Sequence, residues 1–194
     1  MGGKNINGDP DKIYCRSTNF QEDNVVNQNE NQNHKSEQFT QIIDLNEKKE
    51  KINVDEGIKW LRKASLAGET GAMNELAYQL LTGEKIKQDL EEGEKWLRKS
   101  SELGDRWAMM ELGFRLLTGD GLNKDVREGE KWLRKSAELQ YPTAMRILGY
   151  RLLTGRELEK NIEEGEKWLR KAAEAGEAIA MREWGKYLLN GFIK

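Results

Sequence analysis

The chain has 194 residues, of which 37% are hydrophobic and 34% are charged, and its formal net charge is -2 at pH 7. A surface that follows nucleic-acid phosphates needs a clustered positive excess, so this balance excludes nucleic acid as an expected partner. No apolar run approaches the roughly 20 residues of a membrane helix, and the N-terminal sequence has neither a signal-peptide nor a myristoylation pattern. We therefore expect a cytoplasmic protein with no membrane partner.

Residues 1–36 form a polar segment rich in Asn, Gln, Asp, Glu and Lys. Such a segment does not bury enough apolar surface to offset the entropy that ordering would cost. The composition therefore predicts a disordered polar tail over 1–36, followed by a helical repeat domain over 37–194. A short linear motif around Ile13, Tyr14 and Cys15 that folds onto a partner is the alternative for the tail.

From residue 51 the sequence repeats with a period of 36 residues. In each copy, apolar residues at helical spacing lead to a glycine suited to end a helix, and an acidic turn then begins a second helix. The charges on this second helix include the i,i+4 pairs Glu91–Lys95 and Glu94–Arg98, which indicate a solvated face. A fixed period predicts stacked helix-turn-helix units. The expected first helices cover 71–82, 107–118, 143–154 and 179–190, and the second helices cover 55–67, 89–103, 125–139 and 161–175.

Two residue types recur at fixed positions in the second helix of every copy. A glycine lies three residues before each tryptophan. A glycine inside a helix costs about 1 kcal/mol relative to alanine, so its repetition predicts that two backbones approach closely where the helices of a hairpin cross. The tryptophan is expected to fill volume between neighbouring units. These structural repeat residues are Gly57, Gly93, Gly129 and Gly165, with Trp60, Trp96, Trp132 and Trp168.

The strings AMMELGFRLLTG (108–119) and WLRKAAEAG (168–176) resemble the Sel-one-like repeat, a branch of the tetratricopeptide-type helical hairpins. The resemblance covers about residues 51–192. It implies an all-α fold, a right-handed superhelical α-solenoid of 36-residue helix-turn-helix repeats. The sequence departs from the family pattern at one position, because glycine replaces the usual alanine three residues before each repeated tryptophan. The resemblance implies a non-catalytic scaffold or adaptor for protein–protein interaction.

No catalytic or metal-binding constellation emerges from the sequence, so we expect neither an enzyme nor a cofactor. The single histidine, His34, and the single cysteine, Cys15, both precede the repeats, which disfavours a zinc site or a Ser-His-Asp arrangement. The loop GDGLNKD (119–125) lacks the spacing and closing glutamate of a calcium loop and is interpreted as a turn. A cysteine-rich branch of the family has been linked to β-lactam binding or hydrolysis, and such a hydrolase is the less favoured alternative.

Residues that differ between copies are better candidates for binding. Position 78 and its equivalents project about 150° from the centre of the apolar stripe, and in helical solenoids the first helices line the concave surface. Aromatic residues, Met and Arg are enriched in protein interfaces. The alternative is that these rings only pack between adjacent first helices. We expect a protein or peptide partner on the concave face, bound by Asn74, Tyr78, Met110, Phe114, Arg146, Tyr150, Arg182 and Lys186.

The last first-helix copy differs from the others at a core position. Trp184 stands where the earlier copies have leucine, and we interpret the larger ring as a cap for the open end of the array. A second hypothesis is weak self-association through this C-terminal repeat end, which would make the chain a self-assembling structural repeat protein.

Overall fold

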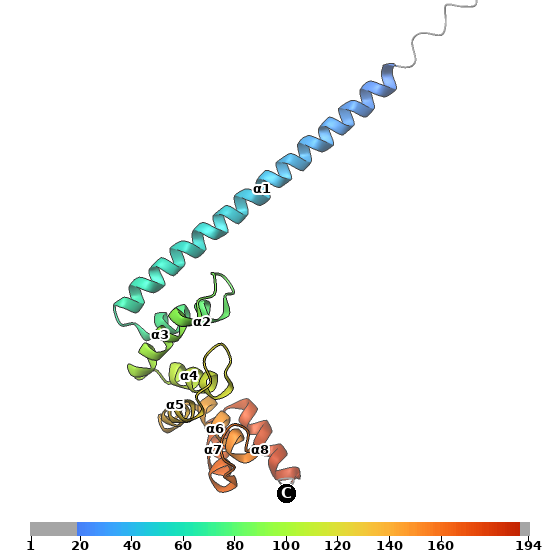
Figure 1. The fold of residues 1–194 in the computed structure, drawn as a ribbon. Helices are drawn as coiled ribbons and strands as arrows, with labels where there is room; N and C mark the ends of the chain where they lie inside the picture. Colours follow the sequence, from blue (N-terminus) through green and yellow to red (C-terminus); the bar gives the residue numbers. More distant parts are fainter. Residues whose placement is uncertain (1–18, 191–194) are drawn as a thin grey trace, which may run out of the picture. The chain divides into compact units, whose positions relative to one another are not determined.

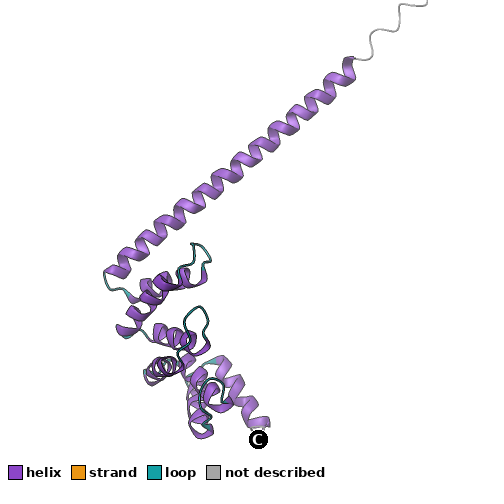
Figure 2. Ribbon diagram, viewed as in Figure 1, coloured by secondary structure: helices purple, strands orange, loops and turns teal. Residues whose placement is uncertain are grey.

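Every regular element in the described part of the chain is an α-helix. The computed structural model describes the backbone of residues 19–190 and the side chains of 40–190 apart from 42, 50 and 52. Within these residues there are eight helices and no strand (Figures 1 and 2). This confirms the predicted all-α repeat fold. The helices are α1 (Asn19–Leu66), α2 (Thr70–Thr82), α3 (Leu90–Glu102), α4 (Arg106–Thr118), α5 (Val126–Glu138), α6 (Pro142–Thr154), α7 (Ile162–Glu174) and α8 (Ala178–Asn190).

Helix α1 crosses the expected boundary between tail and repeats, since it is continuous from Asn19 to Leu66. The sequence has neither glycine nor proline from residue 11 to residue 56, so nothing in this stretch interrupts a helix. Residues 1–18, which include the proposed motif around Tyr14, lie outside the described residues. Internal contacts divide the chain into two units, Met1–Asn53 and Val54–Lys194. The second unit carries the repeats.

Local hydrogen bonds fix where the helices of the second unit begin and end. The side chain of Asp89 accepts a hydrogen bond from the backbone N–H of Glu92 at 2.9 Å, which caps the start of α3. Asp125 and Asn161 do the same for α5 and α7. Helices α2, α4 and α6 are each followed by a glycine in the left-handed region, such as Gly119 with φ 79° after α4. The period of 36 residues therefore comes from repeated cap chemistry as well as from the apolar stripe.

The two helices of a hairpin meet at their glycines. A Cβ built on Gly113 of α4 would lie 2.9 Å from the carbonyl oxygen of Gly129 of α5, and a Cβ on Gly129 would lie 2.8 Å from that of Gly113. Gly149 and Gly165 make the same contact between α6 and α7. In the α2–α3 hairpin one glycine is replaced by Ala77, and a Cβ on the remaining glycine would meet side-chain atoms of Leu81 instead. Backbone contact thus brings the two helices close together within the α4–α5 and α6–α7 hairpins.

The repeated tryptophans are buried to different degrees. Trp132 is 9% exposed and belongs to an apolar cluster with Leu97 and Leu112. Trp96 and Trp168 are half-buried, whereas Trp60 near the end of α1 is 59% exposed. The tryptophan therefore fills space between units only where a neighbouring unit lies beside it. Between residues 19 and 190, no helix has both the length and the apolar character needed to cross a membrane.

Candidate functional site

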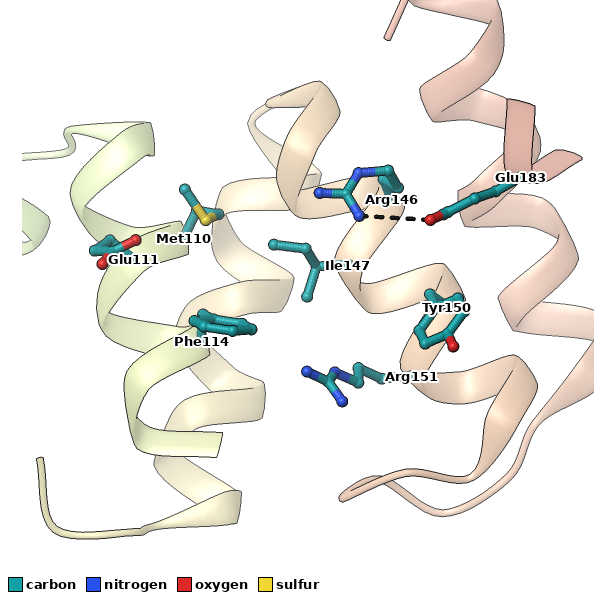
Figure 3. A pocket seen from close by; sticks show the side chains of 8 residues that line it. All are labelled: Met110, Glu111, Phe114, Arg146, Ile147, Tyr150, Arg151 and Glu183. Carbon is teal, nitrogen blue, oxygen red and sulfur yellow. Dashed lines mark ion pairs between the residues drawn. The ribbon is translucent and has the colours of Figure 1, made fainter. Parts of the chain in front are cut away.

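Four of the eight residues predicted to bind a partner line one hollow between α4, α6 and α8 (Figure 3). Met110 and Phe114 lie one turn apart on α4, and Arg146 and Tyr150 lie one turn apart on α6, so the repeat brings the two pairs side by side. The hollow, which we call the α4–α6–α8 groove, has a volume of about 340 Å³. Its lining residues are Met110, Glu111, Phe114, Arg146, Ile147, Tyr150, Arg151 and Glu183.

The polar end of the groove holds an ion pair whose hydrogen-bonding capacity is not used up. A terminal nitrogen of Arg146 lies 3.9 Å from Glu183 Oε1, and Nε lies 3.4 Å from Oε1 of Glu177. In the described part of the chain, neither Arg146 Nε nor Glu183 Oε2 forms a hydrogen bond, although both atoms are buried. A buried polar atom left in this state costs about 1–3 kcal/mol. Arg146 and Glu183 therefore place a cation and an anion, only loosely paired, at this end of the groove.

The other end of the groove is aromatic and positively charged. The guanidinium carbon of Arg151 lies 5.8 Å from the ring centroid of Phe114, within the range of a cation–π contact. A terminal nitrogen of Arg151 also lies 2.7 Å from Glu157 Oε2, which holds the side chain in place. Figure 3 shows Phe114 and Tyr150 on opposite sides of the groove, each from its own helix. The groove thus combines two rings with fixed cations.

The other four predicted residues lie outside the groove lining. Asn74 accepts a hydrogen bond from the hydroxyl of Ser100 at 2.6 Å, which ties α2 to α3. Tyr78 is exposed, and its hydroxyl donates a hydrogen bond to Glu84 at 2.7 Å; this bond raises the pKa of Tyr78 above its usual value. Arg182 and Lys186 are exposed on α8.

Four lining residues were missed by the sequence analysis. Glu111, Ile147 and Glu183 share one repeat position, 36 residues apart, directly after the predicted position of Met110. Arg151 directly follows Tyr150. The signal was present, because neighbouring positions on a helix face border the same surface, but only two positions per helix were considered.

A second polar feature joins consecutive second helices, and we call it the Arg–Glu–Trp ladder. Arg98 of α3 donates two hydrogen bonds to Glu128 of α5, at 2.5 and 3.0 Å. Glu128 also accepts a hydrogen bond from Nε1 of Trp132 at 3.2 Å. The same contacts recur at the other two steps. These steps are Arg62–Glu92–Trp96 and Arg134–Glu164–Trp168.

The expected i,i+4 pairs are also confirmed. Lys95 lies 2.6 Å from Glu91, and Arg98 lies 2.8 Å from Glu94. Arg98 therefore binds a carboxylate of its own helix and one of the next unit. In the repeated string EGEKWLRKS, the first glutamate, the tryptophan and the arginine hold neighbouring hairpins together.

The ladder lowers the pKa of its glutamates. The hydrogen bonds from Arg98 lower the pKa of Glu128 below its usual value of 4.5, burial opposes this, and the hydrogen bond from Trp132 adds to the lowering. Glu92 and Glu164 have lowered pKa values for the same reasons. A carboxylate whose pKa is depressed in the folded state contributes stability above its unfolded pKa, and this contribution is lost as the pH falls through the folded pKa.

Glu128→Gln is expected to lower the free energy of unfolding by about 1 kcal/mol at neutral pH, a figure reduced for the partial exposure of the pair. The loss should shrink as the pH falls through the lowered pKa of Glu128, because Glu128 is then protonated in the wild type as well. Urea unfolding at several pH values measures both effects. Glu91→Gln, at a largely exposed pair, is the control and should change little. A deficit that stays constant down to low pH would contradict the role of the Glu128 charge.

Stacked hairpins of one length, a fixed period and a groove across three first helices define a helical-repeat protein. A model described as Sel1 repeat matches residues 48–69, 70–105, 108–141 and 142–177, which is more than half of the chain. The chain belongs to the Sel1 repeat family. Proteins of this family commonly act as protein-interaction modules.

Solved structures show the same fold. A Sel1 repeat protein from Oxalobacter formigenes is 28% identical, with a TM-score of 0.59, and the match covers 67% of this chain and 98% of that one. The protective antigen c5321 of uropathogenic Escherichia coli is 26% identical, with a TM-score of 0.66, over 72% of this chain but only 30% of that longer chain. Cysteine rich protein B of Helicobacter pylori is 24% identical, with a TM-score of 0.53, over 68% and 94%, and this likeness concerns the fold alone. A comparison with curated proteins gave no match.

Proposed function

We propose that the protein is a non-catalytic interaction scaffold that binds an extended segment of a protein partner in the α4–α6–α8 groove. The observation that carries the proposal is that Phe114 and Tyr150 line one groove together with Arg146 and Glu183, whose paired atoms are 3.9 Å apart. An extended peptide offers a carbonyl or carboxylate oxygen for the arginine and an N–H for the glutamate. An extended peptide therefore contacts both charged side chains at once.

The remaining lining residues support a peptide side chain beside these polar contacts. Phe114 and Tyr150 present rings from two helices, and Met110 is buried one turn before Phe114 on α4. Aromatic residues, Met and Arg are the types that carry binding energy at protein interfaces. The volume of about 340 Å³ is enough for one or two side chains. We infer that an apolar residue of the partner inserts between the rings, while its backbone contacts Arg146 and Glu183.

The groove chemistry favours binding over catalysis. Its lining contains neither histidine nor cysteine, and its arginines are paired with carboxylates. Exposed residues beside the groove, Arg182 and Lys186 on α8, would extend the contact on one side. Tyr78 on α2 lies outside the groove lining, and Asn74 serves the α2–α3 hairpin through Ser100.

The test is selection of peptides from a displayed random library on the intact protein, followed by affinity measurements on variants. Phe114→Ala and Arg146→Gln are each expected to weaken the selected peptides by roughly 10- to 30-fold, because removal of a central contact costs about 2 kcal/mol. Tyr78→Ala is the matched control, since this exposed ring lies outside the groove, and it should leave the affinity unchanged.

Two results would overturn the groove proposal. One is a selection that enriches no peptide. The other is a set of peptides that bind the wild type and both groove variants equally, while circular dichroism shows that the variants are folded. Peptides affected by Tyr78→Ala alone would move the binding surface to α2.

A further inference from the structure

Among the described residues, the first and last helices of the repeats carry the two halves of one incomplete hairpin. Within the second unit, each first helix packs against the second helix that follows it, as α6 packs against α7. In the described part of the chain no second helix follows α8. Likewise, residues 54–66 of α1 form a second helix that no first helix precedes. Each of these helices therefore has one face without the neighbour that its equivalents have.

The glycines of these two helices are left without a contact. Gly185 of α8 is the equivalent of Gly149, and Gly57 of α1 is the equivalent of Gly165. A Cβ on Gly149 would lie 2.9 Å from the carbonyl oxygen of Gly165, whereas a Cβ on Gly185 or on Gly57 would meet no atom within 4 Å. A helix-interior glycine costs about 1 kcal/mol, and no contact within the described residues offsets this cost at either position.

Apolar side chains are exposed on the same two faces. Leu188 of α8 is 63% exposed, whereas its equivalent Leu152 in α6 is 2% exposed. On α1, Trp60 is exposed where Trp132 is buried. The rings of Trp184 and Tyr187 stack at 5.2 Å and pack on the C-terminal core, but they do not cover Leu188. Trp184 therefore does not close this end of the array.

In the part of the chain that the structure describes, the Arg–Glu–Trp ladder is also incomplete at its last and first helices: α7 has an arginine without a carboxylate from a next unit, and α1 has a glutamate without an arginine. Arg170 of α7 is the equivalent of Arg134, but it is exposed and pairs only with Glu174 of its own helix, at 2.8 Å. Glu56 of α1 is the equivalent of Glu164 and is exposed. Among the described residues no arginine forms an ion pair with Glu56. The end with α7 and α8 thus offers the cation that the end with α1 lacks.

We propose that these two ends bind each other between copies of this chain, so that α8 of one copy packs against residues 54–66 of α1 in the next. The new hairpin repeats the α6–α7 pair: Gly185 meets the partner's Gly57, and Arg170 binds the partner's Glu56. The two surfaces differ, so the contact is head-to-tail and adds copies in a row, which a symmetric dimer does not do. This contact uses surfaces outside the groove and requires no bound peptide.

Two variants, each blocking one end, test the proposal. Gly57→Leu obstructs the α1 face, and Gly185→Leu obstructs the α8 face; both positions have open space in the single chain, so folding is preserved. Sedimentation velocity across micromolar to millimolar concentrations should show wild-type mass growing beyond a dimer. Each variant alone should remain monomeric. An equimolar mixture should form a dimer and nothing larger, because only one pair of open ends remains.

Several results would overturn the proposal. A wild type that stays monomeric throughout would do so, as would a Gly57→Leu variant that still dimerises, because that result indicates a symmetric contact through α8. Charge exchange gives a second check: Arg170→Glu and Glu56→Arg should each weaken association by about tenfold, and the double variant should recover it. Glu91→Gln, at an exposed position of α3, is the control and should associate as the wild type does.

Discussion

Trp132→Ala is expected to lower the free energy of unfolding by about 3–5 kcal/mol, the usual cost of emptying a buried tryptophan site. Trp132 is 9% exposed and packs in one apolar cluster with Leu97 and Leu112. Truncation leaves a cavity between consecutive hairpins and also removes the hydrogen bond that its Nε1 donates to Glu128. Urea unfolding followed by far-ultraviolet circular dichroism, on protein dilute enough to be monomeric, measures the loss.

Trp60→Ala is the matched control for this prediction. Trp60 occupies the same repeat position and has the same cation–π contact, with Nζ of Lys63 4.4 Å from its ring centroid. It is 59% exposed, so its removal should cost less than about 1 kcal/mol. Equal losses at the two positions would contradict the conclusion that the tryptophan acts by filling space between units.

Gly149→Ala is expected to destabilise the fold by about 3 kcal/mol, at the upper end of the cost of overpacking. The new Cβ would lie 2.7 Å from the backbone nitrogen of Leu169 and 2.9 Å from the carbonyl oxygen of Gly165. These are backbone atoms, which do not rotate away as a side chain does, so the two helices must separate. Thermal and urea unfolding both report the loss.

Gly185→Ala is the control and should change stability in the opposite direction. A Cβ at this position meets no atom within 4 Å, so alanine gains helix propensity without a clash. The variant should be more stable by about 0.5–1 kcal/mol when measured as a monomer. If both substitutions destabilise the chain, the glycine pair is not the reason that Gly149 is required.

The fold could be predicted from the sequence because the same signals, namely apolar residues at helical spacing, a glycine that ends a helix and an acidic turn that begins one, recur in every copy. The glycine before each tryptophan was informative because its cost in a helix demands a compensating contact, and such a contact exists at Gly129 and Gly165. The missing contact at Gly57 could not be inferred from the residue, because it depends on which helix lies beside it. Composition alone also gave no sign that α1 begins as early as Asn19.

The sites were predicted only in part, for two physical reasons. Half of the residues that line the groove were predicted. Only two positions on each first helix were considered, whereas a helix face includes more, so Arg151 and Glu183 also line the groove. The ladder was missed because Arg98 already has a carboxylate partner one turn away, Glu94, and so did not look unpaired. Its second partner, Glu128, lies on another helix, and only the stacking distance between units brings the two together.

Helix α8 is supported on one side only, and this links the two proposed binding events. It carries Glu183 into the groove, while its opposite surface exposes Leu188 and Leu189. A helix that is enclosed on one side only frays more readily than one enclosed by neighbours. A peptide in the groove and a second copy on α8 both require the ordered helix, so each would reduce the entropy that the other must overcome. Peptide affinity should then rise with protein concentration, which is positive cooperativity without any change of backbone shape.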